Sequence, residues 1–130
     1  MSFLFLSVDE VIYIHQAETE LLGNNSSIRD LNLVKSAVEN TKLLFANGYV
    51  TDLFDLAVSY IRSITMNHPF IDGNKRTALA SALVFMEYNG YVINESTDFE
   101  LANLILEFIN KKLTEAELAE HLRNNASRIA

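Results

Sequence analysis

The side chains best suited to chemistry lie together in one stretch, His68 to Thr77, which reads HPFIDGNKRT. This stretch holds the only proline of the chain and one of its three histidines. His68 suits general-base chemistry, because an ordinary histidine titrates close to neutral pH. Asp72 supplies a carboxylate, and Mg²⁺ in phosphate sites is commonly held by one or two carboxylates together with phosphate oxygens. The stretch therefore predicts a catalytic base at His68 and a metal ligand at Asp72.

The second half of the stretch has the composition of a phosphate-binding site. A helix is expected to begin at about Asn74, and the first turn of a helix carries unpaired N–H groups and a partial positive charge. Lys75 and Arg76 add full positive charge there, which opposes the helix dipole unless an anion is bound. Gly73 lets the backbone approach a ligand closely, and Asn74 can cap the helix and donate from its amide. The pattern predicts that residues 73–76 bind a phosphate group.

Each of these features also has a plainer interpretation. A lone histidine before a proline is more often a turn or cap residue than a catalyst, and residues 72–74 could form an ordinary turn followed by a helix cap. Lys75 and Arg76 could be solvated surface charge, although both lie at the wrong end of a helix for the dipole. Phe70 lies between polar candidates, and we expect it to insert into the core as the structural anchor of the loop.

Helices must position this stretch, because four glycines and one proline are too few for a turn-rich β fold. Capping boxes, in which Ser or Thr is followed three residues later by Glu, begin the first, fifth and sixth predicted helices. The residue before a proline is pushed out of the α region, so the third helix should end near Asn67. The six helices run from Ser7 to Gly23, from a cap at Asp30 or Ser27 to Asn47, from Thr51-Asp52 to about Asn67, from about Asn74 to Tyr88, from Thr97 to about Asn110 and from Thr114 to about Arg123.

The fourth of these helices is expected to be the buried, central one. Its middle, residues 78–86, carries no charge on any face, and a helix that is apolar all round is typical of a core position. The predicted fold class is therefore all-α: one compact bundle of about six helices around a buried central helix, with at most a minor strand at residues 4–6 or 92–93. We expect a single domain over residues 1–130, since no repeat or linker composition is present.

Composition narrows the classes of function. The chain of 130 residues has 49% hydrophobic and 21% charged residues, which is typical of a globular protein that buries a core. The absence of cysteine excludes disulfides and thiolate metal sites. The net charge of −7 argues against a nucleic-acid partner, because phosphate backbones repel an acidic protein. No apolar run is long enough for a membrane span and no basic leader precedes the apolar start, so we expect a cytoplasmic protein without a signal peptide or a membrane partner.

The stretch from His68 resembles the signature of the Fic/Doc (Fido) family, His-x-Phe-x-Asp/Glu-Gly/Ala-Asn-x-Arg. It matches that signature at every fixed position: His68, Phe70, Asp72, Gly73, Asn74 and Arg76. Outside the signature, residues 28–30 (IRD), 51–54 (TDLF) and 74–79 (NKRTAL) are similar to the death-on-curing (Doc) branch of the family. The resemblance covers about residues 7–125 and implies the helical Fic/Doc fold.

The resemblance implies an enzyme that uses ATP and Mg²⁺ to modify a Ser, Thr or Tyr hydroxyl of a cellular protein. Most Fic members transfer AMP, whereas the Doc branch transfers the terminal phosphate to a translation elongation factor and acts as a toxin. By position, His68 would deprotonate the target hydroxyl and Asp72 would help to hold Mg²⁺. Residues 73–76 would bind the phosphates, the first two of them as an anion hole.

Three positions bear on which group is transferred. Members that transfer AMP usually have a second arginine where this chain has Leu79, and many have glycine where it has Lys75. Both differences favour phosphate transfer, so we expect a kinase toxin, with protein adenylylation as the alternative. Gly73 is the residue of the AMP-transferring members, since Doc proteins tend to have alanine there, and the transferred group stays open. A non-catalytic module that binds a nucleotide or an antitoxin is a further alternative, against which the intact signature argues.

Control is expected from a separate protein. In this family an inhibitory helix resembles Ser/Thr-x-x-x-Glu-Gly/Asn, and the nearest stretch here, Ser96 to Glu100, is followed by Leu101. The resemblance therefore implies a small antitoxin that acts in trans. The loop at Tyr49 and Val50 lies where the family has a flap that docks the target backbone, so these two residues are candidates for target docking.

The other polar candidates are expected to have no catalytic role. His15 and His121 lie on amphipathic helices without a carboxylate or histidine at ligand spacing, so we expect both at the surface or its boundary. Arg29 and Asp30 are interpreted as a capping pair at the second helix. The resemblance to the Doc branch also allows them a role near the site, and we leave them out of the catalytic set.

Overall fold

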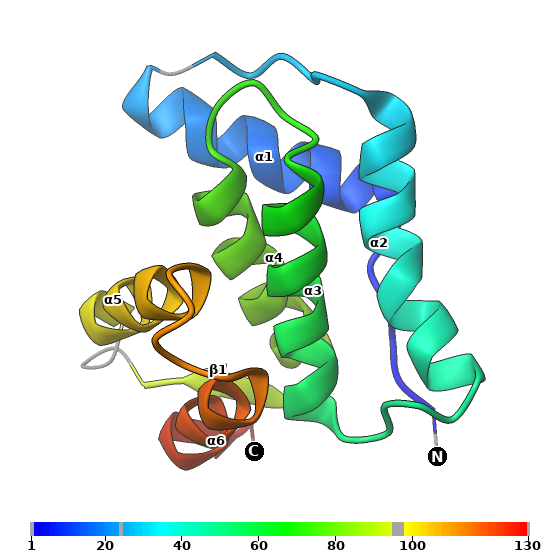
Figure 1. The fold of residues 1–130 in the computed structure, drawn as a ribbon, viewed down its shortest axis with the longest axis vertical. Coiled ribbons are helices and arrows are strands. Elements are labelled where there is room, and N and C mark those ends of the chain that lie inside the picture. The colour runs from blue at the N-terminus through cyan, green and yellow to red at the C-terminus, as the bar shows by residue number, and fades with distance from the viewer. Residues whose placement is uncertain (1, 24, 95–97, 130) are drawn as a thin grey trace.

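The computed structural model describes residues 2–23, 25–94 and 98–129, and nearly all of its regular structure is helical (Figure 1). The expected all-α class is confirmed. The elements are α1 (Val8–Leu22), α2 (Leu31–Ala46), α3 (Leu53–Asn67), α4 (Asn74–Tyr88), β1 (Tyr91–Ile93), α5 (Asp98–Ile109), α6 (Glu115–Asn125) and β2 (Ala126–Arg128).

A small antiparallel ribbon is the only sheet in the described part of the chain. Its strand β1 is the one that the sequence predicts, and it pairs with β2, which the sequence does not predict, in a register that places Val92 opposite Ser127. The alternative strand at residues 4–6 does not form. That segment is held instead by the carboxamide of Asn89, which accepts from the Leu4 N–H and donates to the Leu4 carbonyl.

Local capping explains where most helices begin. Ser7 and Glu10 form the predicted capping box of α1, and α6 has the same arrangement at its start. Of the two possible caps for α2, Asp30 is the one used, since its carboxylate accepts from the N–H groups of the first turn. The capping box predicted at Thr97 lies outside the described residues.

The helix α3 is the most buried of the described helices. Ten of its fifteen residues are buried, against seven of fifteen in α4, the helix that the sequence predicts to be central. The reason is that α3 is enclosed by α2, α4 and α6, so that apolar side chains are buried on several of its faces. Its two buried serines are paired: Ser59 shares a hydrogen bond with Thr41, and Ser63 accepts one from Asn40. An absence of charge therefore does not identify the most buried helix.

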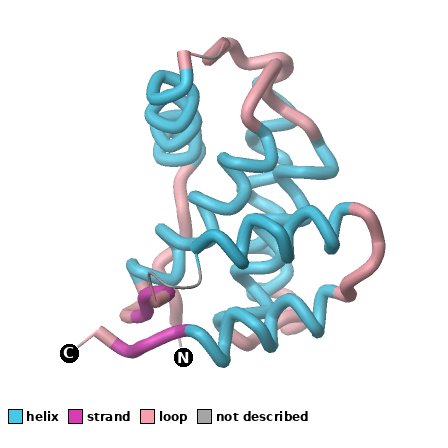
Figure 2. Tube along the Cα trace, turned by 90° about the vertical axis from the view of Figure 1, so that its left-hand side faces the viewer, coloured by secondary structure: helices cyan, strands magenta, loops and turns pink. Residues whose placement is uncertain are grey.

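The packing places one loop at the end of the molecule. Helix α3 contacts α2, α4 and α6, while α1 packs on α4 and crosses the upper end of the α3–α4 pair (Figure 1). The loop 68–73, which joins α3 to α4, lies at that end beside the connection from α1 to α2. Figure 2 shows these connections at the top of the trace, far from the two strands at the bottom. No helix in the described part of the chain has the length and apolar character that a membrane crossing requires.

Candidate active site

The loop 68–73 begins with a residue in the left-handed conformation. His68 ends α3, as its place before a proline predicts, but its φ of 49° and ψ of 55° are left-handed and not the extended conformation usual before proline. This conformation costs a non-glycine residue about 1–2 kcal/mol, so neighbouring contacts must hold it. The guanidinium of Arg29 donates to the carbonyl oxygens of His68 at 2.7 Å and Asn67 at 2.9 Å. Arg29 thus closes the carboxyl end of α3 from a distant part of the chain.

The side chain of Asn74 anchors the loop from within. Its Oδ1 accepts from the Phe70 N–H at 3.0 Å, and its Nδ2 donates to the Phe70 carbonyl at 2.9 Å and to His68 Nδ1 at 3.0 Å. Asn74 therefore does not cap α4, contrary to the prediction, and Gly73 is the N-cap, without any side-chain cap bond. Because both amide hydrogens are used, only the backbone N–H of Asn74 is left for an anion.

The same contact assigns the tautomer of His68. The orientation of the Asn74 amide is fixed by the Phe70 N–H, so its NH₂ group is the donor toward His68 Nδ1. A neutral imidazole whose Nδ1 accepts a hydrogen bond carries its hydrogen on Nε2. The ring of His68 is exposed, so Nε2 can meet a group that enters from solvent.

Beneath the loop lies His15, which is expected from the sequence at the surface or its boundary. Its side chain is fully buried, and its ring stacks on the buried Phe70 ring with centroids 3.7 Å apart. The His15 Nε2 lies 2.7 Å from the carbonyl oxygen of Asp72. Burial lowers the pKa of His15, since a charged ring there would lose its hydration. The surface assignment is wrong because the loop, distant in sequence, covers this face of α1.

The spacing of residues along α1 could have predicted that His15 is buried. The buried residues of α1 are Val11, His15 and Thr19, each four positions apart, so they share one face of the helix. His15 thus lies in the middle of the core-facing stripe. Arg29 has no periodic signal of this kind, because its partners depend on how α3 ends, and the resemblance of residues 28–30 to the Doc branch is what points to it. His121 is exposed, as expected.

Gly73 packs against that same face of α1. Its φ of 79° is in the region that favours glycine, and a Cβ at this position would lie 3.0 Å from Thr19 Cγ2. The hydroxyl of Thr19 donates to the His15 carbonyl, which fixes the side chain beneath the loop. The backbone conformation therefore favours glycine, and a larger residue would press on Thr19.

The outer side of the loop lines a cavity of about 390 Å³. Leu22, Thr65 and Ile71 form part of its walls. The rest of the lining consists of six predicted site residues: His68, Asp72, Gly73, Asn74, Lys75 and Arg76. Phe70 is not among them, since its ring is fully buried beneath the loop. The fold thus brings the predicted base, carboxylate and cations to one opening at the start of α4.

The cavity is electrostatically suited to a bound phosphate. Lys75 and Arg76 are exposed, and neither forms an ion pair within the described part of the chain. Their charges add to the partial positive charge at the N-terminus of α4. Asp72 is also exposed, and no cluster of three metal-ligating side chains is found among the described residues. A single carboxylate beside an anion site fits Mg²⁺, which takes its other ligands from phosphate and water.

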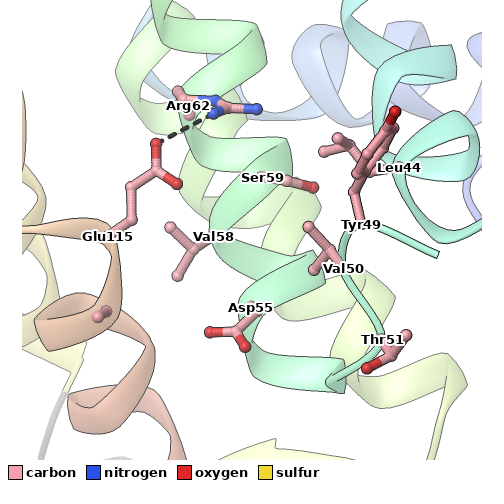
Figure 3. A pocket seen from close by; sticks show the side chains of 10 residues that line it. Leu44, Tyr49, Val50, Thr51, Asp55, Val58, Ser59, Arg62 and Glu115 are labelled. Carbon is pink, nitrogen blue, oxygen red and sulfur yellow. Dashed lines mark hydrogen bonds and ion pairs between the residues drawn. The ribbon is translucent and has the colours of Figure 1, made fainter. Parts of the chain in front are cut away.

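Tyr49 and Val50 are not brought to this cavity. They line a different one of about 380 Å³, together with Asp55, Arg62 and other residues of α3 and α6 (Figure 3). The two cavities share no lining residue and lie toward opposite ends of α3, a helix about 22 Å long. Tyr49 is 79% exposed. A docking role for this loop stays a prediction.

Comparisons with known proteins agree on one family. Residues 5–86 match the sequence profile described as the Fic/DOC family. The chain is 30% identical over 118 residues to "Protein kinase doc" of Escherichia phage P1, covering 91% of this chain and 92% of that protein. It is 35% identical over 83 residues to "Toxin Doc" of Mycolicibacterium smegmatis, covering 61% of this chain and 60% of that protein.

Proposed function

Because this chain belongs to the Fic/DOC family and resembles its Doc toxins, we propose that it is a toxin that transfers the terminal phosphate of ATP to a protein hydroxyl. The observation that carries the proposal is the cavity of about 390 Å³, in which His68 lies beside the exposed cations Lys75 and Arg76 and the N-terminus of α4. The proposed target is a Ser, Thr or Tyr side chain of a translation factor. We also propose that residues 1–130 form one Fic/DOC domain.

The phosphates of ATP are held, in this proposal, by backbone and side-chain groups together. The N–H groups of Gly73 and Asn74 face the β- and γ-phosphates as an anion hole, and Lys75 and Arg76 neutralise their charge. Asp72 is the protein ligand of Mg²⁺. When bound, Mg²⁺ reduces the negative charge of the phosphates and so makes attack by an oxygen nucleophile easier.

His68 acts as the general base toward the target hydroxyl. In the resting arrangement its Nδ1 accepts from Asn74, so the nitrogen able to take a proton is not free. The ring is exposed and, within the described part of the chain, has this one hydrogen bond. We propose that the ring turns away from Asn74 when substrate binds, which exposes the unprotonated nitrogen to the hydroxyl.

Two features favour phosphate transfer over AMP transfer. The position of the second arginine of AMP-transferring members is Leu79, an apolar residue in a neighbouring pocket that shares Arg76 with the His68 cavity. The relative from phage P1 is named a protein kinase. Protein adenylylation is the alternative, and Leu79→Arg is expected to raise AMP transfer if the missing cation is what prevents it.

A toxin of this kind needs an inhibitor in its host. Both relatives carry Doc names and one is named a toxin, which supports a toxin–antitoxin system with a small antitoxin as partner. The stretch nearest to an internal inhibitory helix, Ser96 to Glu100, overlaps residues outside the described part of the chain.

The test is incubation with a cell lysate and ATP labelled at either the γ- or the α-phosphate. Protein label from the γ position alone is expected, and α label would indicate AMP transfer. His68→Ala should lower transfer at least about a hundredfold, the effect of a positioned base. His121→Ala, which changes an exposed histidine outside the cavity, is the matched control. Absence of label from both positions would leave the non-catalytic module as the better interpretation.

A further inference from the structure

The buried ring of His15 has one hydrogen bond among the described residues, and that bond is with the candidate active-site loop. A carbonyl oxygen can only accept, so the 2.7 Å contact between His15 Nε2 and the Asp72 carbonyl requires a hydrogen on Nε2. The other nitrogen, Nδ1, is buried and has no hydrogen-bond partner in the described part of the chain. A second proton at Nδ1 would be buried without an acceptor, which is costly. The ring is therefore a neutral, single donor aimed at one carbonyl.

The direction of that carbonyl determines where the next N–H points. No peptide bond in the described chain is cis, and in a trans peptide the C=O and N–H groups point to opposite sides. Since the Asp72 carbonyl is turned inward to His15, the N–H of Gly73 is turned outward. Gly73 lines the cavity, and its N–H has no acceptor within the described residues. The inward bond thus presents a free donor on the outer side.

We propose that His15 is a positioning residue: it holds the Asp72–Gly73 peptide in the orientation that aims the Gly73 N–H at a bound phosphate. This inference rests on the proposed phosphate site. His15 does not touch the ligand and acts only through the loop. The ring is kept in place by its stacking on Phe70 and by its packing near Gly73, where an added Cβ would lie 3.7 Å from Nε2.

A purely structural role for His15 makes a different prediction, and two substitutions separate the two roles. His15→Phe keeps an aromatic ring on Phe70 but removes the donor. His15→Gln loses the ring but places an amide N–H near the position of Nε2. Positioning requires Gln to bind phosphate better than Phe, whereas a stacking or space-filling role requires the reverse order.

The first measurement is calorimetry with Mg²⁺ and ATP, made well below the unfolding temperature of each variant. We expect ATP affinity to fall about tenfold in His15→Phe, the effect of one misdirected donor to a charged group, and His15→Gln to recover most of it. Val11→Ala is the matched control, since Val11 is equally buried on the same face of α1, one turn away from His15, and has no polar group that could orient the loop. Equal losses in Val11→Ala and His15→Phe would overturn the inference, as would wild-type affinity in His15→Phe.

The second measurement needs no nucleotide and no foldable variant. In ¹⁵N-histidine-labelled wild-type protein, the His15 ring should give the NMR shifts of the neutral tautomer with hydrogen on Nε2, and a hydrogen on Nδ1 would overturn the inference. Where the variants fold, the Gly73 amide resonance should move in His15→Phe and less in His15→Gln. If wild type binds ATP but labels no protein, the proposed transfer fails while ATP affinity and the NMR shifts still decide the role of His15.

Discussion

The two loops that flank α3 are held in different ways. In the loop before it, residues 47–51, the backbone hydrogen bonds found in the described structure all return to α2: Gly48 donates to Phe45, and both Tyr49 and Val50 donate to Leu44. These partners lie within six positions in the sequence. The loop is thus a local continuation of one helix, and its tip projects into solvent.

The loop after α3, residues 68–73, is held by segments far away in the chain. The Pro69 carbonyl accepts from the N–H groups of Arg29 and Asp30, and the Ile71 N–H donates to the Ser27 carbonyl. His15 and Asn74 add contacts from α1 and α4. A strained residue such as His68 persists only where its surroundings determine it several times over. The comparison indicates that loop 68–73 is built to keep its geometry, whereas loop 47–51 can change shape without loss of the fold.

The largest effect is expected from removing the anchor within loop 68–73. Asn74→Ala leaves the N–H and the carbonyl of Phe70 without their partner, and both are buried. Each buried, unpaired group costs about 1–3 kcal/mol, so we expect the free energy of unfolding to fall by about 2–4 kcal/mol. Urea unfolding measures the change, and phosphate transfer should be lost with it. A loss below about 0.5 kcal/mol would mean that the loop does not depend on Asn74.

The next effect concerns the fit of the loop on α1. Gly73→Ala should destabilise by about 1–2 kcal/mol, because alanine disfavours the left-handed conformation. Its Cβ would also press on Thr19 Cγ2. Combining it with Thr19→Ser removes that methyl group but keeps the hydroxyl, so the double variant should recover the steric part of the loss. If the losses in unfolding free energy of the two single variants add strictly in the double variant, the added Cβ does not clash with Thr19 Cγ2.

A smaller effect is expected at the carboxyl end of α3. Arg29→Ala removes the donors to the His68 and Asn67 carbonyls and should cost about 1 kcal/mol, since these charge-assisted bonds are exposed to water. Arg128→Ala is the control, because Arg128 is exposed on β2, a strand that lies far from loop 68–73 (Figure 2) and lines neither cavity, and its removal should cost at most about 0.5 kcal/mol. Transfer should fall only in Arg29→Ala. If both variants lost the same unfolding free energy and the same transfer activity, Arg29 would contribute no more to the site than an ordinary surface arginine.

The features that the sequence predicted correctly depend on contacts between neighbouring residues, and those that it missed depend on contacts between distant ones. The capping boxes at Ser7 and Thr114 and the end of α3 before Pro69 depend on residues within four positions, and all three are confirmed. The motif also predicted most of the side chains that line the cavity, because they lie within nine consecutive residues of the chain. The supports could not be predicted in this way. His15 lies 57 positions from Asp72, and Arg29 lies 39 positions from His68, so their roles arise only when the helices pack.

The role of Asn74 shows a second limit. An asparagine after a glycine at the start of a helix has the type of a cap, and sequence alone cannot tell a cap from an anchor that turns back into the loop. The position of Tyr49 shows a third limit of prediction from sequence, because chain order does not tell which cavity a loop residue lines. Its assignment to a docking loop came from chain order, and the structure places it in a different cavity from His68.

The smallest effect on stability is expected in loop 47–51, where Tyr49→Ser changes a side chain that is 79% exposed. The free energy of unfolding should stay within about 0.5 kcal/mol of wild type, and the affinity for Mg²⁺ and ATP should not change. If the loop docks the protein target, the KM for that target should rise severalfold while transfer at saturating target is kept, because only binding outside the reacting centre is lost. Tyr13→Ser, at a tyrosine that is 71% exposed on α1, is the matched control. An unchanged KM in Tyr49→Ser would assign target recognition to the rim of the His68 cavity. A change in the affinity for ATP would mean that the two loops are coupled through α3, although each is held by different hydrogen bonds.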